Sequence, residues 1–228
     1  MKKYIEDTIK VVLFDHDDTL VRTIEAKWAE HKHIAKKYYG KDLTDDELHK
    51  HWGKPLSTMI GLLYGTDDLI QAMDYVKITQ NDFPKKLHDD TLATLKHLKK
   101  ASRKIGVITA TTRHSFENDL KTLHIPENLF DYTQTEDDTS FHKPDPRVFK
   151  PVLLWLKQEG IKPSEVVYVG DGLHDMKAAL GAGFEFIGVS TGLVTQSTFK
   201  KNGATAILKL SDLIEEYFVD KIPMKVDL

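Results

Sequence analysis

The chain has 228 residues, with 32 Lys and Arg against 35 Asp and Glu, so its formal net charge is −3 with His neutral. This balance excludes the clustered basic excess of a nucleic-acid-binding domain, and a hydrophobic content of 40% excludes a disordered chain. The absence of cysteine excludes disulfides, cysteine-ligated metal centres and thiol nucleophiles, so any covalent chemistry has to use oxygen or nitrogen side chains.

The first predicted element is a buried β-strand over residues 11–14, with the sequence VVLF. It ends in the polar run DHDDT, which places Asp15 and Asp17 beyond its carboxyl end. Residues separated by one position in extended backbone can point to the same side, so the strand can present two carboxylates together. Taken alone, an Asp-x-Asp pair is more typical of a turn or a solvated edge than of a catalytic pair.

Helical patterns then replace the strand pattern over residues 22–84. A long amphipathic stretch closes at Gly40, and Thr44 with Glu47 matches a capping box at the start of the next helix. We predict that residues 22–84 are an inserted α-helical cap and that residues 1–21 and 85–228 form the core. The insert explains a length that is too large for one compact domain of roughly 100–150 residues and too small for two.

Strands and helices alternate through the rest of the chain, which predicts a parallel sheet. The fold class is therefore α/β, with a Rossmann-like parallel sheet core, helices on both faces and the inserted α-helical cap. Ligands bind such sheets beyond the carboxyl ends of the strands. The predicted strands are residues 105–109, 166–170 and 186–190, and the predicted helices are residues 91–100, 115–123, 146–158 and 173–180.

The sequence also bears on location. No apolar run approaches the roughly 18 residues of a membrane helix, and Glu6 and Asp7 interrupt the place where a signal peptide is apolar. We therefore predict a cytoplasmic protein without a membrane or nucleic-acid partner. The oligomeric state is left open.

A second acidic motif, GDGLHD at residues 170–175, follows another apolar strand. It brings Asp171 to the same edge of the sheet as Asp15 and Asp17, with Asp175 one helical turn later. Two carboxylates about 4 Å apart repel by roughly 4 kcal/mol at an effective dielectric near 20, so the cluster needs a cation. Oxygen ligands of this kind suit a hard ion, and we predict Mg²⁺.

Two further residues complete a predicted phosphate site. Thr109 ends the strand IGVIT, where its hydroxyl and the following backbone N–H can donate hydrogen bonds. Lys143 lies in the segment HKPDP, where prolines restrict the loop that presents it. Each is commonplace alone, and the argument depends on their combination with the two acidic motifs.

Taken in order, these four segments resemble the haloacid dehalogenase superfamily, specifically its phosphatase branch with a small helical cap, such as the phosphoglycolate phosphatases. The resemblance spans residues 11 to about 191, and the predicted insert lies where many members carry their cap. The matching residues are Asp15-x-Asp17-x-Thr19-Leu20, Thr109, Lys143-Pro144, and Gly170-Asp171 with Asp175.

The resemblance implies a role for each matching residue. Asp15 is the nucleophile that forms an aspartyl-phosphate, and Asp17 is the general acid and base. Thr109 and Lys143 bind the phosphoryl oxygens, together with the backbone at His16, Asp17 and Ala110. The Mg²⁺ ligands are Asp15, the backbone carbonyl of Asp17, Asp171, and Asp175, which ligates directly or orients metal-bound water.

Some positions depart from the family pattern or lie beside it. Asp18 stands where glycine is common, and Asp tolerates unusual backbone angles better than most residues. The side chain of His16 is expected to be free to vary. In the cap, the loop Gly53-Lys54-Pro55 makes Lys54 the candidate for a substrate contact, whereas Trp28, Trp52 and Tyr38 are expected to form the cap's own core.

The favoured function is a Mg²⁺-dependent phosphatase that hydrolyses a phosphate monoester of a small metabolite. A phosphomutase resembling β-phosphoglucomutase is the alternative, because it uses the same aspartyl-phosphate. A 2-haloacid dehalogenase is disfavoured by Asp17 and Asp171. A non-catalytic phosphoacceptor module is disfavoured because its acceptor lies on the third strand and it has no cap. The substrate stays open among phosphoglycolate, sugar phosphates, nucleotides and pyrophosphate.

Overall fold

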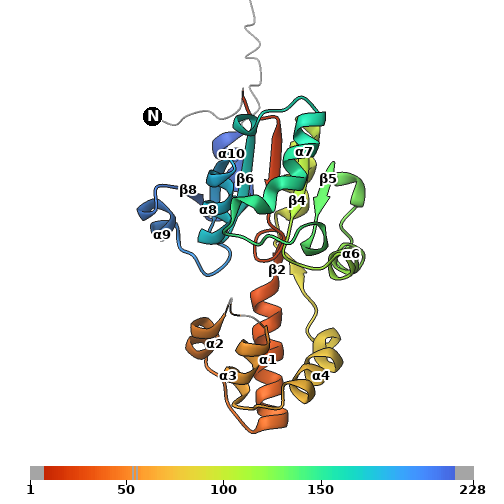
Figure 1. Cartoon of the computed structure of the whole chain (residues 1–228), viewed down its shortest axis with the longest axis vertical. Coiled ribbons are helices and arrows are strands. Elements are labelled where there is room, and N and C mark those ends of the chain that lie inside the picture. Colours follow the sequence, from red (N-terminus) through yellow and green to blue (C-terminus); the bar gives the residue numbers. More distant parts are fainter. Residues whose placement is uncertain (1–7, 53, 55, 219–228) are drawn as a thin grey trace, which may run out of the picture. The chain divides into compact units, whose positions relative to one another are not determined.

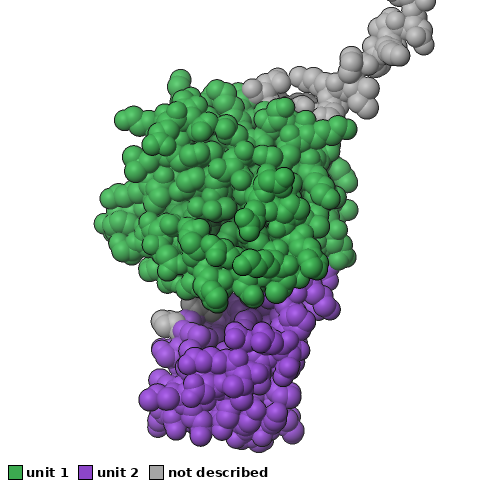
Figure 2. All heavy atoms as spheres, turned by 90° about the vertical axis from the view of Figure 1, so that its right-hand side faces the viewer, with its two compact units in different colours: residues 1–21, 87–228 green, residues 22–86 purple. Residues whose placement is uncertain are grey.

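A computed structural model of the chain describes residues 8–52, 54 and 56–218 (Figure 1). It divides into two units, one made of residues 1–21 and 87–228 and the other of residues 22–86 (Figure 2). We call them the core unit and the helical unit. Among the described residues, no helix is long and apolar enough to cross a membrane.

The described part of the core unit contains a six-stranded sheet in the order β5-β4-β1-β6-β7-β8. Every neighbouring pair is parallel, as predicted from the alternation of strands and helices. The two edge strands were not predicted, because three residues are too few to show a period. The strands are β1 (Val11–Phe14), β4 (Lys104–Ile108), β5 (Tyr132–Gln134), β6 (Val166–Gly170), β7 (Glu185–Val189) and β8 (Thr205–Ile207).

Helices cover both faces of this sheet, which confirms the predicted Rossmann-like α/β fold. Alternate residues of β1 enter different hydrophobic clusters, with Val12 and Phe14 on the first face and Val11 and Leu13 on the second. The first face is covered by α5 (Thr91–Lys100), α6 (Arg113–Thr122) and α10 (Ser211–Tyr217). The second face is covered by α7 (Lys150–Gln158), α8 (Leu173–Gly181) and α9 (Gln196–Lys201).

The helical unit has a hydrophobic core of its own, on which Trp28, Trp52 and Tyr38 pack as predicted. Thr44 and Glu47 form the predicted capping box, and Gly40 ends the first helix in the left-handed conformation, φ 64°. Its helices are α1 (Thr23–Tyr39), α2 (Asp45–His51), α3 (Leu56–Tyr64) and α4 (Leu69–Thr79), and the short strands β2 (Val21–Arg22) and β3 (Lys86–Leu87) pair at its two ends.

Candidate active site

The candidate site lies at the carboxyl ends of β1, β4 and β6, which are neighbours in the sheet. Asp15 follows β1, Thr109 follows β4 and Asp171 follows β6 directly in the chain. Because Phe14 pairs with Val107 on one side and with Val169 on the other, the three strands end level with one another. The parallel register therefore brings three separate parts of the sequence to one edge, as the sequence predicted.

Lys143 lies at the centre of this site. Its ammonium nitrogen Nζ donates to Asp15 Oδ1 at 2.6 Å and to Asp175 Oδ1 at 2.7 Å. The Lys143 side chain is only 6% exposed and that of Asp175 is fully buried, so these are charge-assisted hydrogen bonds shielded from water. The loop that carries Lys143 continues through a cis peptide bond to Pro144.

Tyr168 is the third partner of Lys143 and was not predicted. Its hydroxyl accepts from Lys143 Nζ at 2.7 Å and donates to the backbone carbonyl of Ile108 at 3.0 Å. Tyr168 is fully buried within the otherwise apolar strand β6. A buried tyrosine needs a hydrogen-bond partner for its hydroxyl. A tyrosine within the apolar run VVYVG was therefore the sequence signal for this contact.

Negative charge exceeds what Lys143 can balance. Burial raises the pKa of Asp15 to about 6, and although Lys143 opposes this rise, the carboxylates of Asp175 and Asp17 add to it. Burial, followed by the carboxylates of Asp175 and Asp15, raises the pKa of Asp171 well above its ordinary value. For Lys143, burial alone would lower the pKa, but Asp15 and Asp175 together raise it well above its ordinary value. The site can therefore accept another cation.

Three of the carboxylates lie close enough together to hold a hard divalent cation. Asp15, Asp171 and Asp175 each offer one oxygen atom, and these atoms lie within 4.8 Å of one another. Two glycines leave room for them. A Cβ atom at Gly192 would lie 1.9 Å from Asp171 Oδ2, and one at Gly170 would lie 2.7 Å from Asp175 Cγ. The donor set and the space around it fit Mg²⁺.

Thr111 is a second unpredicted residue of the site. Its hydroxyl donates to Asp17 Oδ2 at 2.6 Å, and its backbone N–H donates to Thr109 Oγ1 at 3.0 Å. Thr109 is buried, whereas Ala110 between the two threonines is exposed. The bond between Thr111 and Thr109 leaves the Thr109 hydroxyl proton available to a ligand. The repeated threonines of TATT were the only signal for this contact in the sequence.

The expectation that the His16 side chain is free to vary is wrong. Side chains alternate along extended backbone, so His16 points away from Asp15 and Asp17 and toward α6. Its ring is completely buried, with Nε2 3.0 Å from Asp119 Oδ2 and the ring edge packed against Phe116.

Asp18 has φ 55°, the left-handed region that Asp tolerates better than most residues. Its backbone carbonyl accepts a hydrogen bond from Thr191 Oγ1 at 2.5 Å, so the loop after β7 also borders the site. The loop after β7, which contains Thr191 and Gly192, was not predicted as part of the site.

Lys54 belongs to the helical unit, where it is exposed and its backbone N–H donates to the carbonyl of His51 at 3.4 Å. Gly53 and Pro55, predicted to share its loop, lie outside the described residues. Lys54 therefore stays a prediction as a substrate contact.

Known proteins resemble this chain over most of its length. A family model described as haloacid dehalogenase-like hydrolase matches residues 12–189. Pyrophosphatase PpaX of Bacillus pumilus is 32% identical over 212 residues, which cover 92% of this chain and 96% of the relative.

Solved structures also resemble this chain over most of its length. A candidate haloacid dehalogenase-like hydrolase from Bacteroides fragilis has a TM-score of 0.71 at 30% identity and covers 90% of this chain and 100% of its own. A candidate β-phosphoglucomutase from Thermotoga maritima has a TM-score of 0.78 at 25% identity and covers 91% of this chain and 97% of its own.

Proposed function

This chain belongs to the haloacid dehalogenase-like hydrolase family, and from that premise we propose that it is a Mg²⁺-dependent phosphatase that acts through an aspartyl-phosphate on Asp15. The observation that supports this most strongly is the 2.6 Å contact between Lys143 Nζ and Asp15 Oδ1, two residues 128 positions apart in the sequence. A buried carboxylate held by an ammonium, beside further carboxylates, suits attack on a phosphoryl group.

In the first half of the proposed reaction, a carboxylate oxygen of Asp15 forms a bond to phosphorus while the bond to the leaving oxygen breaks. Asp17 donates its proton to that leaving oxygen. In the second half, Asp17 takes a proton from water, the water oxygen attacks phosphorus, and Asp15 leaves as a carboxylate with inorganic phosphate as the product. Thr111 orients Asp17 for both transfers through its 2.6 Å hydrogen bond.

Lys143, the Thr109 hydroxyl and the backbone at His16, Asp17 and Ala110 are proposed to bind the phosphoryl oxygens. Mg²⁺ would be held by Asp15, Asp171 and Asp175 with the backbone carbonyl of Asp17. When bound it supplies positive charge that offsets the carboxylates and the phosphoryl group.

The substrate is proposed to be a small phosphorylated metabolite, and pyrophosphate is the first compound to test because the relative from Bacillus pumilus is named a pyrophosphatase. The helical unit is proposed to select the substrate, with Lys54 as its first candidate contact. A phosphomutase is the second candidate, favoured by the similarity to the structure from Thermotoga maritima. The cytoplasmic location stays a prediction.

The test is phosphate release from pyrophosphate, p-nitrophenyl phosphate and a panel of metabolite phosphates, with and without Mg²⁺. We expect Mg²⁺-dependent release that Asp15→Asn abolishes, while the matched change Asp74→Asn at an exposed position of the helical unit leaves it intact. Turnover retained by Asp15→Asn would refute this residue as the nucleophile. A mutase would instead convert a sugar phosphate with little release of inorganic phosphate.

A further inference from the structure

The hydrogen bond between His16 and Asp119 is not used by the proposed reaction. His16 is completely buried and Asp119 is 8% exposed, and they join positions 103 residues apart. An ionised Asp119 can only accept at this 3.0 Å contact, so the contact is satisfied by the His16 tautomer that carries its proton on Nε2. The other ring nitrogen, Nδ1, is buried without a hydrogen-bond partner in the described part of the chain.

Such a pair is a poor way to stabilise a hydrophobic face. Removing both groups from water is unfavourable, and a well-packed apolar pair of similar volume is often as stable or more stable. The surroundings are apolar, since Phe116 and Leu120 of the same helix belong to the first hydrophobic cluster. The pair is therefore better suited to fixing the position of the groups it joins than to adding stability.

The pair connects the nucleophile loop to the segment that carries Thr109. His16 bonds to Asp119 on one side of the loop, and Asp17 accepts from Thr111 on the other. Adjacent side chains point in opposite directions, so these two bonds restrain the loop from both sides. They add to the backbone hydrogen bonds that already hold the loop, from Asp15 N–H to the carbonyl of Val169 and from Asp18 N–H to the carbonyl of Val21.

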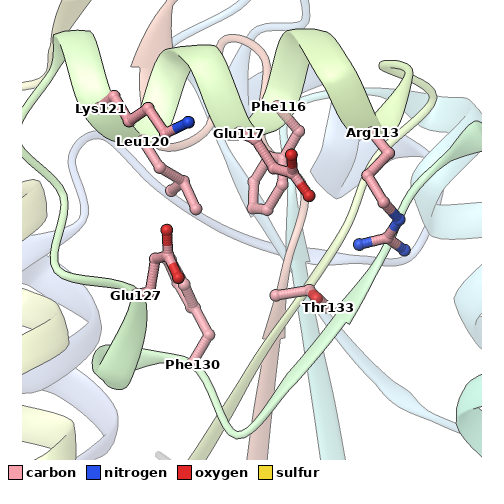
Figure 3. Close-up of a pocket in the computed structure, with 8 residues that line it drawn as sticks. All are labelled: Arg113, Phe116, Glu117, Leu120, Lys121, Glu127, Phe130 and Thr133. Atoms are coloured by element: carbon pink, nitrogen blue, oxygen red, sulfur yellow. The ribbon is translucent and has the colours of Figure 1, made fainter.

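A hollow borders α6 on one side. A pocket of about 480 Å³ opens beside this helix, with Phe116 and Leu120 of α6 on one wall and Phe130 and Thr133 opposite (Figure 3). Phe116 and Leu120 are still buried in the first hydrophobic cluster, so the pocket is an open hollow beside a packed helix. The bond from Asp119 to His16 supplies a directional contact on the side of α6 that faces the sheet.

We propose that His16 and Asp119 are positioning residues, which keep the Asp15–Asp17 backbone in register with the Thr109–Ala110 segment. This proposal rests on the proposed function, because it assigns the pair to the geometry in which Asp15 attacks phosphorus. The pair touches neither substrate nor metal. It acts through the loop, where a displacement of about 1 Å can cost up to roughly 100-fold in rate.

The experiment compares kcat, KM and thermal stability for His16→Leu, Asp119→Leu and the double variant. We expect each single variant to lower kcat by about tenfold or more with KM within about threefold, and the double variant to lose no more than either single one. The conservative variants His16→Gln and Asp119→Asn retain a donor and an acceptor and should restore most of kcat. Leu120→Ala is the control, a buried change in α6 expected to lower stability without lowering kcat.

A spectroscopic arm is independent of turnover. In the wild type the His16 Nε2 proton should give a slowly exchanging NMR signal that Asp119→Leu removes, and the amide signals of Asp15 and Asp17 should shift in that variant. Unchanged amide signals, or wild-type kcat in both leucine variants, would overturn the proposal. Absence of phosphate release from the wild type contradicts the proposed function instead, and the amide signals still decide the positioning proposal.

Discussion

Both units bury a carboxylate against a lysine, and the two arrangements differ in charge. In the helical unit, Glu30 is completely buried, and it accepts from Lys27 at 2.7 Å and from the Thr79 hydroxyl at 3.1 Å. One carboxylate meets one ammonium there. In the core unit, Lys143 meets both Asp15 and Asp175, with Asp171 beside them. A buried ion pair alone is therefore weak evidence for a functional site, and the excess of buried carboxylates is what singles out the core unit as the candidate.

The largest expected effects come from replacing the lysine of each pair, Lys143 in the core unit and Lys27 in the helical unit. Lys143→Met should lower kcat by about 10²–10³-fold, because it deletes a preorganised donor at the site of charge development. Lys27→Met should instead lower the free energy of unfolding by about 1–3 kcal/mol, because the buried carboxylate of Glu30 loses its charged hydrogen-bond donor. Steady-state kinetics and urea unfolding of both variants separate the two outcomes. An equal loss of kcat in Lys27→Met would remove the distinction between the units.

The next effect concerns the space around Asp171. Gly192→Ala places a Cβ 1.9 Å from Asp171 Oδ2, so the carboxylate has to move. Displacing a ligand in this way should weaken Mg²⁺ affinity by about 10–100-fold. The Mg²⁺ concentration that raises the melting temperature measures this change in the absence of substrate. Gly61→Ala in the helical unit, where the nearest atom is 3.3 Å away, is the matched control and should leave Mg²⁺ affinity unchanged.

One titrating group in each unit should make the stability of the protein depend on pH, and the two dependences should have opposite signs. Burial, with the carboxylates of Asp175 and Asp17, raises the pKa of Asp15 from 3.8 to about 6, against the opposing effect of Lys143. In metal-free protein the native state therefore keeps a proton that the unfolded chain has released. The contribution of Asp15 to stability is complete below about pH 4 and is lost as the pH rises through about 6.

His31 in the helical unit gives the reverse slope. Burial, and then Lys27, lowers its pKa from 6.5 to about 4, so the unfolded chain binds a proton that the native state does not. The contribution of His31 to stability is present above about pH 6.5 and is lost as the pH falls through about 4. The measurement is the melting temperature in EDTA across this pH range. Its slope against pH should differ from that of the wild type in both Asp15→Asn and His31→Gln, and the two differences should have opposite signs. Changes of the same sign would contradict these pKa directions.

Much of the site follows from strand periodicity, because a buried parallel strand that ends in polar residues delivers them to a known edge of the sheet. This is why the sequence alone predicts that Asp15, Thr109 and Asp171 lie together. Lys143 was also expected there, though from its combination with the other motifs rather than from its loop alone.

Contacts that depend on facing side chains of distant elements could not be predicted. Tyr168 looks like a core residue until the position of Lys143 is known, and the partner of His16 lies on a helix face 103 residues away. Gly192 has no side chain to indicate a role, and its importance depends on the approach of Asp171. These contacts arise from tertiary geometry, which periodicity and local motifs do not encode.

The smallest expected effect uses two threonines, one in each unit, whose hydroxyl groups contact a carboxylate. Thr111 donates to Asp17 Oδ2 at 2.6 Å, whereas Thr79 shares its one hydroxyl proton between Glu30 Oε1 at 3.1 Å and the carbonyl of Tyr75 at 2.8 Å. A hydrogen bond of this kind contributes about 1 kcal/mol net, so Thr111→Val should lower kcat about fivefold where the acceptor is the proposed acid and base. Thr79→Val removes a bond to a structural carboxylate and should lower stability while leaving kcat unchanged. Kinetics and unfolding measured side by side decide this, and a fall in kcat from Thr79→Val alone would reverse the roles assigned to the two carboxylates.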